Sequence, residues 1–136
     1  MLVNVMKIPR QILEELIQHA RREYPNECCG ILGGQGDEVR QLFPLTNIDR
    51  SPVKYLADPR EQLGVFQKLE GGSEEMVGIY HSHPNAPCYP SQIDVGLAAY
   101  PEAVYIIISL IDRENPQVRG FRIVEGTISE EELEII

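Results

Sequence analysis

The chain has 136 residues, of which 43% are hydrophobic and 24% are charged, and its formal net charge is −9 at pH 7. A chain of this length can bury a sizeable core without disulfides, and the sequence has no apolar run long enough to cross a membrane. The acidic balance disfavours a surface that binds nucleic-acid phosphates. We therefore expect one soluble domain spanning residues 1–136. The first residues, Met1–Lys7, lack a signal-peptide pattern, which predicts a cytoplasmic location.

The first half of the chain alternates helical and extended patterns. The pattern predicts, in order, a helix over residues 8–23, strands over 28–34 and 39–45, a loop over 47–55 and a helix over 58–70. The first helix rests on apolar residues at helical spacing, such as Ile12 and Leu16, and Pro25 ends it. The second begins with Asp58 as a possible cap and Pro59 in its first turn.

The second half of the chain continues the alternation. We expect a strand over residues 76–83, a helix from Ser91 to Tyr100, strands over 104–110 and 117–124, and an acidic tail over 129–136 that is a short helix or a frayed end. Helices interleaved with strands in this way indicate an α+β fold. The expected architecture is a mixed β-sheet flanked by helices, in a two-layer or three-layer sandwich.

Two histidines stand at the end of the strand over residues 76–83. Alternate residues of a strand point to the same face, so His81 and His83 project side by side, roughly 6–7 Å apart at Cα. Neutral imidazole is the commonest metal ligand, and two histidines with one carboxylate leave zinc an open position for water. The alternative is an exposed or hydrogen-bonded pair, which is the commoner state of an isolated His-x-His.

Ser91 and Asp94 follow the histidines at a predicted helix start. Ser at the N-cap and an acid three residues later fit a capping box. The same geometry holds the Asp94 carboxylate in the first turn, where it is favoured and can face the neighbouring strand end. The residues alone therefore predict a cap and leave open whether Asp94 also binds a metal with His81 and His83.

Three cysteines are present, an odd number in a chain without a signal-peptide pattern, which argues against a disulfide framework. Cys28 and Cys29 are adjacent, and we expect both to be small buried hydrophobic residues. Cys88 lies in the loop between His83 and Ser91. We expect it to pack beneath the site, with metal binding or redox sensitivity as alternatives.

The motif His-x-His-Pro at residues 81–84, followed by Ser-x-x-Asp at 91–94, resembles the signature of the JAMM (MPN+, Mov34/MPN/PAD-1) metallopeptidases. The likeness extends to residues 25–33, which are similar to the Glu-bearing first strand of that family, and to residues 103–109. Residues 8–124 can be laid along this domain, and the chain looks most like its small bacterial members. The resemblance implies the MPN/JAB1 fold, a cytidine-deaminase-like sandwich.

The resemblance also implies roles for five residues. His81, His83 and Asp94 would bind one Zn²⁺ per chain, with water completing the tetrahedron. Glu27 would be the general base, and Ser91 would help to stabilise the oxyanion. Without the resemblance, Glu27 is one of many acidic residues in the sequence, and we would expect it to be a solvated side chain between a helix and a strand.

The activity implied by the resemblance is hydrolysis of the amide bond after the C-terminal Gly-Gly of a ubiquitin-like protein. The short chain favours a small sulfur-carrier protein, or its amino-acid adduct, over ubiquitin itself. One alternative is a non-catalytic MPN-type interaction module, which retention of all five family positions disfavours. Another is a role in DNA metabolism, as in RadC-like proteins, which the acidic charge disfavours.

Overall fold

The structure is a computed structural model that describes residues 4–136. Its elements are β1 (Val5–Ile8), α1 (Arg10–Glu23), β2 (Cys29–Gln35), β3 (Glu38–Leu45), α2 (Pro59–Glu70), β4 (Glu75–His83), α3 (Gln92–Leu97), β5 (Val104–Ser109), β6 (Gln117–Val124) and β7 (Thr127–Ile135). A mixed sheet with three helices over these residues confirms the expected α+β class. Within them, no helix is long and apolar enough to span a membrane. The prediction made from Met1–Lys7 falls partly on residues 1–3, which lie outside the described residues.

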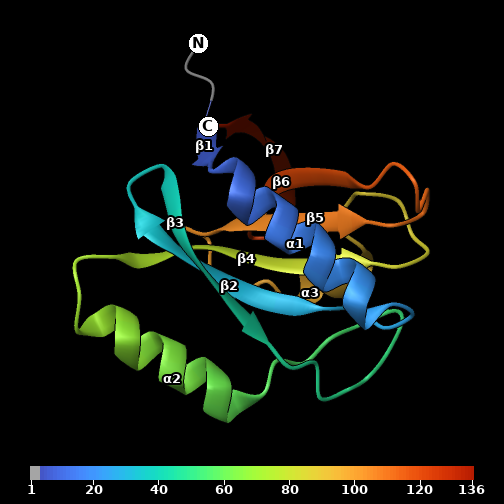
Figure 1. Ribbon diagram of the computed structural model, residues 1–136, viewed down its shortest axis with the longest axis horizontal. Coiled ribbons are helices and arrows are strands. Elements are labelled where there is room, and N and C mark those ends of the chain that lie inside the picture. The colour runs from blue at the N-terminus through green and yellow to red at the C-terminus, as the bar shows by residue number, and fades with distance from the viewer. Residues whose placement is uncertain (1–3) are drawn as a thin grey trace.

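The strands form one sheet in the order β1-β3-β2-β4-β5-β6-β7, which closes on itself as a barrel (Figure 1). β1 closes it by pairing in parallel with β7 along four residues and with β3 at the single pair Lys7 and Glu38. β4 and β5 are also parallel, and the other neighbours are antiparallel. β4 therefore lies inside the sheet, between β2 and β5.

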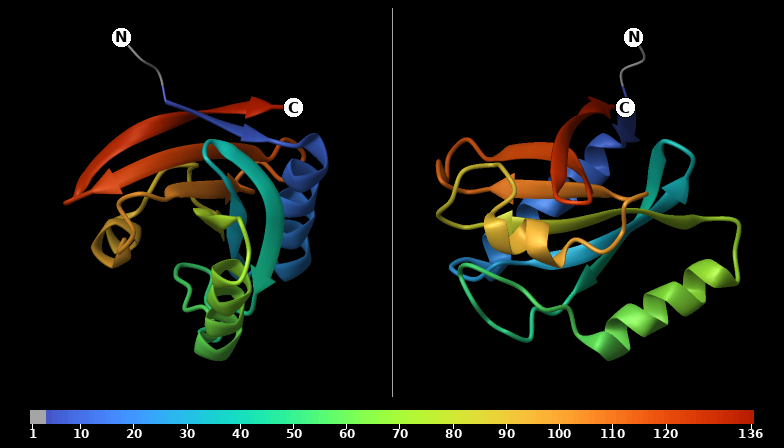
Figure 2. Two further views of the ribbon diagram at one scale, coloured as in Figure 1. Left: turned by 90° about the vertical axis from the view of Figure 1, so that its left-hand side faces the viewer. Right: turned by 180° about the vertical axis from the view of Figure 1, so that it is seen from behind.

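The helices lie on two faces of the sheet (Figure 2). α1 covers one face and buries Ile12, Leu16 and Ala20 in the same apolar cluster as Leu32 of β2. α2 and α3 lie on the opposite face, where Ile31 belongs to a second cluster with residues of α2. Adjacent residues of a strand point to opposite faces, which explains why Ile31 and Leu32 enter different cores.

Two elements differ from the sequence prediction near the chain ends. β1 was not predicted, because four residues carry too little periodicity, and Ile8 belongs to it instead of to α1. The prediction of a helix or frayed end at residues 129–136 is wrong, because residues 129–135 lie in β7. The acidic side chains suit a strand here because Glu130 and Glu131 pair with arginines of β6.

The helix predicted from Ser91 to Tyr100 is shorter in the structure, where α3 ends at Leu97. Ala98 has an extended backbone, and the hydroxyl of Tyr105 accepts hydrogen bonds from the next two backbone N–H groups, at 3.1 and 2.9 Å. The Pro101 that follows cannot continue a helix. The early end leaves α3 as a short element that carries Asp94 in its first turn.

A buried polar pair joins α1 to β4, where His19 Nδ1 is 2.8 Å from the hydroxyl of Tyr80. Burial lowers the pKa of His19 below 6.5, helped by the charge of Arg22 and opposed by that of Glu23. Below pH 6.5 the folded protein binds fewer protons at His19 than the unfolded chain does. The free energy of unfolding therefore decreases as pH falls below 6.5. We expect the free energy of unfolding, measured with urea above and below pH 6.5, to decrease less on the acidic side in His19→Gln than in the unchanged protein. An unchanged pH dependence would contradict this assignment.

Candidate metal centre

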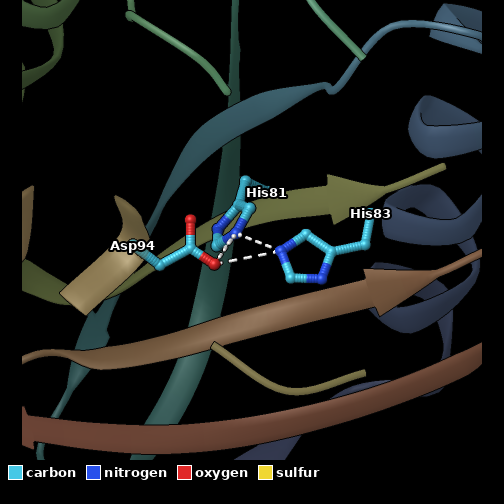
Figure 3. A group of neighbouring side chains, drawn as sticks. All are labelled: His81, His83 and Asp94. Atoms are coloured by element: carbon cyan, nitrogen blue, oxygen red, sulfur yellow. Dashed lines mark hydrogen bonds and ion pairs between the residues drawn. The ribbon is translucent and has the colours of Figure 1, made fainter. Parts of the chain in front are cut away.

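Three side chains converge where β4 ends and α3 begins (Figure 3). The Nε2 atoms of His81 and His83 are 3.1 Å apart, and Oδ2 of Asp94 is 3.1 Å from the first and 3.0 Å from the second. All three side chains are almost fully buried, at 2–5% exposure. Three potential ligand atoms thus form a nearly equilateral triangle beneath the surface.

The two imidazoles are oriented by different contacts. His83 Nδ1 lies 2.8 Å from the carbonyl oxygen of Pro87, which can only accept, so Nδ1 carries the proton and Nε2 offers its lone pair to the group. His81 Nδ1 has no hydrogen-bond partner among the described residues. The ring of Tyr55 stacks on that imidazole instead, with centroids 4.8 Å apart and planes at 26°.

Asp94 caps α3 and also faces the two histidines, two arrangements that the sequence allowed together. Its backbone N–H donates to Ser91 Oγ at 3.0 Å, and its Oδ2 accepts from the Ser91 N–H at 2.9 Å, which is a complete capping box. The same Oδ2 faces both imidazoles. The cap therefore fixes the carboxylate at the position where the histidines converge.

The charges of the group follow from burial and mutual contact. Burial by itself raises the pKa of Asp94, but hydrogen bonds with His81 and His83 outweigh it and hold that pKa well below its usual range. Burial lowers the pKa of His81, which favours the neutral form. Burial opposes protonation of His83 too, yet Asp94 and the Pro87 carbonyl raise its pKa. A metal ion and a proton would occupy the same Nε2 atom of His83, so metal binding competes with protonation of this residue.

The triangle matches the dimensions of a tetrahedral metal site. Zinc bonds of about 2.0–2.2 Å at tetrahedral angles separate ligand atoms by roughly 3.3–3.5 Å. The observed separations of 3.0–3.1 Å are close to this value. With neutral imidazoles and an ionised carboxylate, all three atoms are acceptors, so they need a cation or protons between them. The donor set fits a divalent ion with one open position.

Glu27 precedes β2 and is only 3% exposed, so the alternative of a solvated acid is wrong. Its Oε1 is buried and has no hydrogen-bond partner within residues 4–136. Continuing the β2–β4 register two residues beyond the Cys29–His81 pair brings Glu27 opposite His83. Burial raises the pKa of Glu27 to about 8, opposed by the charge of His83 and reinforced by that of Asp94. A buried, unpaired carboxyl beside ligand atoms is an arrangement typical of catalytic sites.

The cysteines lie outside the metal group. Cys28 and Cys29 are buried and free, as expected, and burial raises the pKa of both thiols to about 12. Cys88 packs with Ile107 and Phe121, and its thiol donates to the Ile107 carbonyl at 3.2 Å. The expected packing role of Cys88 is therefore the one observed.

An apolar cleft of about 230 Å³ lies beside the metal group, lined chiefly by β2, β4 and the loop before α2, with Leu97 at the end of α3. Tyr55 lines this cleft and also the smaller pocket that reaches His81 and Asp94. Leu97 of α3 stands at the border of both and is 68% exposed. Sequence reasoning missed Tyr55, because a single aromatic residue in a predicted loop gives no signal of its contact with a histidine of β4.

The fold and this site have relatives among known proteins. Residues 9–124 match the family of prokaryotic homologs of the JAB domain, and the chain belongs to that family. It is 39% identical over 136 residues to the CysO-cysteine peptidase of Mycobacterium tuberculosis (strain ATCC 25618 / H37Rv), covering 98% of this chain and 93% of the relative. The expected resemblance to this small bacterial type is thereby confirmed.

Two further comparisons agree. The chain is 37% identical over 123 residues to the probable TtuB-protein conjugate cleaving protease of Thermus thermophilus, covering 90% of this chain and 78% of the relative. The solution structure of protein DSY2949 from Desulfitobacterium hafniense superposes with a TM-score of 0.86 at 38% identity, covering 96% of this chain and 92% of that one. The likeness thus extends over nearly the whole sheet and its helices.

Proposed function

We propose that the chain is a zinc metallopeptidase that hydrolyses the amide bond after the C-terminal Gly-Gly of a ubiquitin-like sulfur-carrier protein or its amino-acid adduct. The observation that carries the proposal is the buried carboxyl of Glu27, whose Oε1 has no partner among residues 4–136, next to the triangle of His81, His83 and Asp94. Membership of the JAB family, with relatives named as a peptidase and a protease, supports a hydrolase.

The metal ligands in this proposal are His81, His83 and Asp94. Zinc bound there supplies Lewis acidity, which polarises a carbonyl and lowers the pKa of a neighbouring water toward about 7. The capping box and the Pro87 carbonyl keep two of the ligands in place before the ion arrives. Preformed geometry of this kind reduces the ordering that binding requires.

Glu27 acts as the general base. Its carboxylate takes a proton from the attacking water and returns it to the nitrogen of the leaving amine. Its raised pKa, about 8 in the metal-free protein, makes it a stronger base than an ordinary glutamate once it is ionised. The backbone around Glu27 is held by its N–H bond to the Ser51 carbonyl at 2.9 Å and by the Asn47 amide, which donates to its carbonyl at 3.0 Å.

Ser91 assists the oxyanion. Its Oγ accepts the backbone N–H of Asp94 at 3.0 Å, and this contact does not use the hydroxyl hydrogen. That hydrogen can donate to the oxygen that becomes negative as the tetrahedral state forms. The cap therefore orients the Ser91 hydroxyl while it fixes the Asp94 carboxylate.

A Gly-Gly tail suits this site because it is the narrowest peptide that can reach the buried ligand atoms. The names of two relatives refer to a CysO-cysteine adduct and to TtuB conjugates, which supports a ubiquitin-like carrier as the substrate class. The chain of 136 residues has little room for insertions that would grip a larger partner. A small sulfur carrier is therefore the proposed partner.

The test is intact-mass analysis of a bacterial sulfur carrier ending in Gly-Gly-Cys after incubation with zinc-loaded protein. We expect the carrier to lose the mass of one cysteine residue, and we expect a chelator or Glu27→Gln to block that loss. A zinc-loaded protein that leaves the adduct intact and cleaves another peptide would overturn the substrate assignment. A protein that binds no zinc would overturn the metallopeptidase assignment itself.

A further inference from the structure

The segment between His83 and Ser91 is held by side chains from three neighbouring strands. Three successive carbonyl oxygens accept these bonds: Ala86 from Ser109 Oγ of β5 at 2.6 Å, Pro87 from His83 Nδ1 of β4 at 2.8 Å, and Cys88 from Arg119 Nη1 of β6 at 2.9 Å. The middle carbonyl is the one that orients the His83 imidazole. The two outer contacts lie directly on either side of it.

This segment depends on side-chain donors because of its own composition. Pro84, Pro87 and Pro90 recur at every third position and carry no N–H group. Among residues 4–136, one backbone hydrogen bond lies within the segment, from the Tyr89 N–H to the Pro87 carbonyl at 2.9 Å. A loop with so few internal donors takes its conformation from the groups that bind its carbonyls.

Arg119 has the geometry to hold one end of the loop rigidly. Its Nε and Nη2 form a two-point pair with the carboxylate of Glu130, at 3.1 and 2.6 Å, and its guanidinium lies 5.1 Å from the centre of the Phe121 ring. The remaining nitrogen, Nη1, donates to the Cys88 carbonyl. The planar fork of arginine serves both contacts at once, which the single ammonium of lysine does not.

We propose that Arg119 is a positioning residue of the metal centre. By holding the Cys88 carbonyl, it keeps the adjacent Pro87 carbonyl against His83 Nδ1, and so keeps Nε2 of His83 aimed at the ion. This inference rests on the metal site of the proposed function. Hydrogen bonds to the second nitrogen of a metal-bound histidine fix the tautomer and the ring orientation, and their loss typically lowers metal affinity by 10–100-fold.

Arg122 provides a matched control on the same strand. It pairs with Glu131 of β7, as Arg119 does with Glu130, and it also donates to a backbone carbonyl, that of Glu102 at 2.6 Å. Glu102 lies between α3 and β5, outside the segment that joins His83 to Ser91. Arg122→Met therefore removes an ion pair between β6 and β7 and a carbonyl contact without touching the loop, and its acidic partner is the more buried of the two.

The experiment compares Zn²⁺ affinity, by competition with a chromophoric chelator, for the unchanged protein, Arg119→Met and Arg122→Met. We expect Arg119→Met to bind Zn²⁺ about 10-fold more weakly and Arg122→Met to bind it as the unchanged protein does. Thermal unfolding of the metal-free forms should change little in Arg119→Met, because its ion pair with Glu130 is exposed. It should fall more in Arg122→Met, because the side chain of Glu131 is only 3% exposed and loses its partner, so an unchanged Zn²⁺ affinity in that variant would separate metal binding from stability. Arg119→Lys should bind Zn²⁺ more tightly than Arg119→Met and more weakly than the unchanged protein. If Arg119→Met does not fold, this weaker Zn²⁺ binding by Arg119→Lys tests the proposal.

Two outcomes would overturn the inference alone. One is an unchanged Zn²⁺ affinity in Arg119→Met, and the other is an equal loss in Arg122→Met, which would indicate a general effect of loosening β6 from β7. A third outcome, in which the unchanged protein binds no Zn²⁺, would overturn the proposed function and this inference together. The visible spectrum of the Co²⁺-loaded protein provides a second readout, because a misplaced His83 alters the coordination geometry.

Discussion

Replacing His83 with alanine is expected to abolish both metal binding and peptidase activity. The change removes one of three ligand atoms and leaves the Asp94 carboxylate with a single imidazole partner. The loss of activity should exceed the 10²–10⁴-fold effect typical of losing a general base, because no bound ion remains to polarise the scissile carbonyl. The measurements are metal content after dialysis and cleavage of a carrier adduct.

His19→Gln is the matched control for this prediction, because His19 is a buried histidine of α1, away from the metal group. It should keep its full metal content and its activity at neutral pH. Retention of one equivalent of metal by His83→Ala would show that the ion does not need this imidazole. That result would contradict the ligand assignment drawn from the triangle.

Replacing Glu27 with glutamine is expected to retain the metal and to lose most turnover. Glutamine has nearly the same volume and stays in the same buried position, but it cannot accept and return a proton. We expect kcat to fall by roughly 10²–10⁴-fold, the usual contribution of a general base. Metal content and cleavage rate, measured on the same preparation, separate this result from that of His83→Ala.

Glu23→Gln, at the end of α1, is the control for a nearby acid that is exposed. It should leave the cleavage rate unchanged. Full activity of Glu27→Gln would assign proton transfer to another group. A loss of metal in that variant would instead indicate that Glu27 holds the ion.

The convergence of the histidines and Asp94 could be predicted from the sequence because it depends on local geometry. Strand alternation brings His81 and His83 to one face, and a helix that begins at the N-cap Ser91 holds Asp94 in its first turn. Glu27 is different, because it approaches the group only through the antiparallel pairing of β2 with β4. That long-range pairing has no local signature, so only the family resemblance singled Glu27 out.

The residues that support the site had no sequence signal for the same reason. Tyr55 stacks on His81 from a loop, and Arg119 reaches the Cys88 carbonyl from β6. β7 was mistaken for a helix or frayed end because its glutamates favour helices, and their arginine partners lie on another strand. Interior strands such as β5, with buried residues throughout, were predicted because burial on both faces leaves a continuous apolar run.

The pairing of β1 with β7 has a consequence for how the protein folds during synthesis. It joins the first described strand to the last, so most of the described chain must be made before the barrel can close. Contacts between distant segments carry a larger loop-closure entropy and slow folding. Until β7 emerges from the ribosome, the outer edge of β6 has no partner and offers unpaired backbone groups to other chains. The edge of β6 is therefore open to pairing with other chains until β7 is complete.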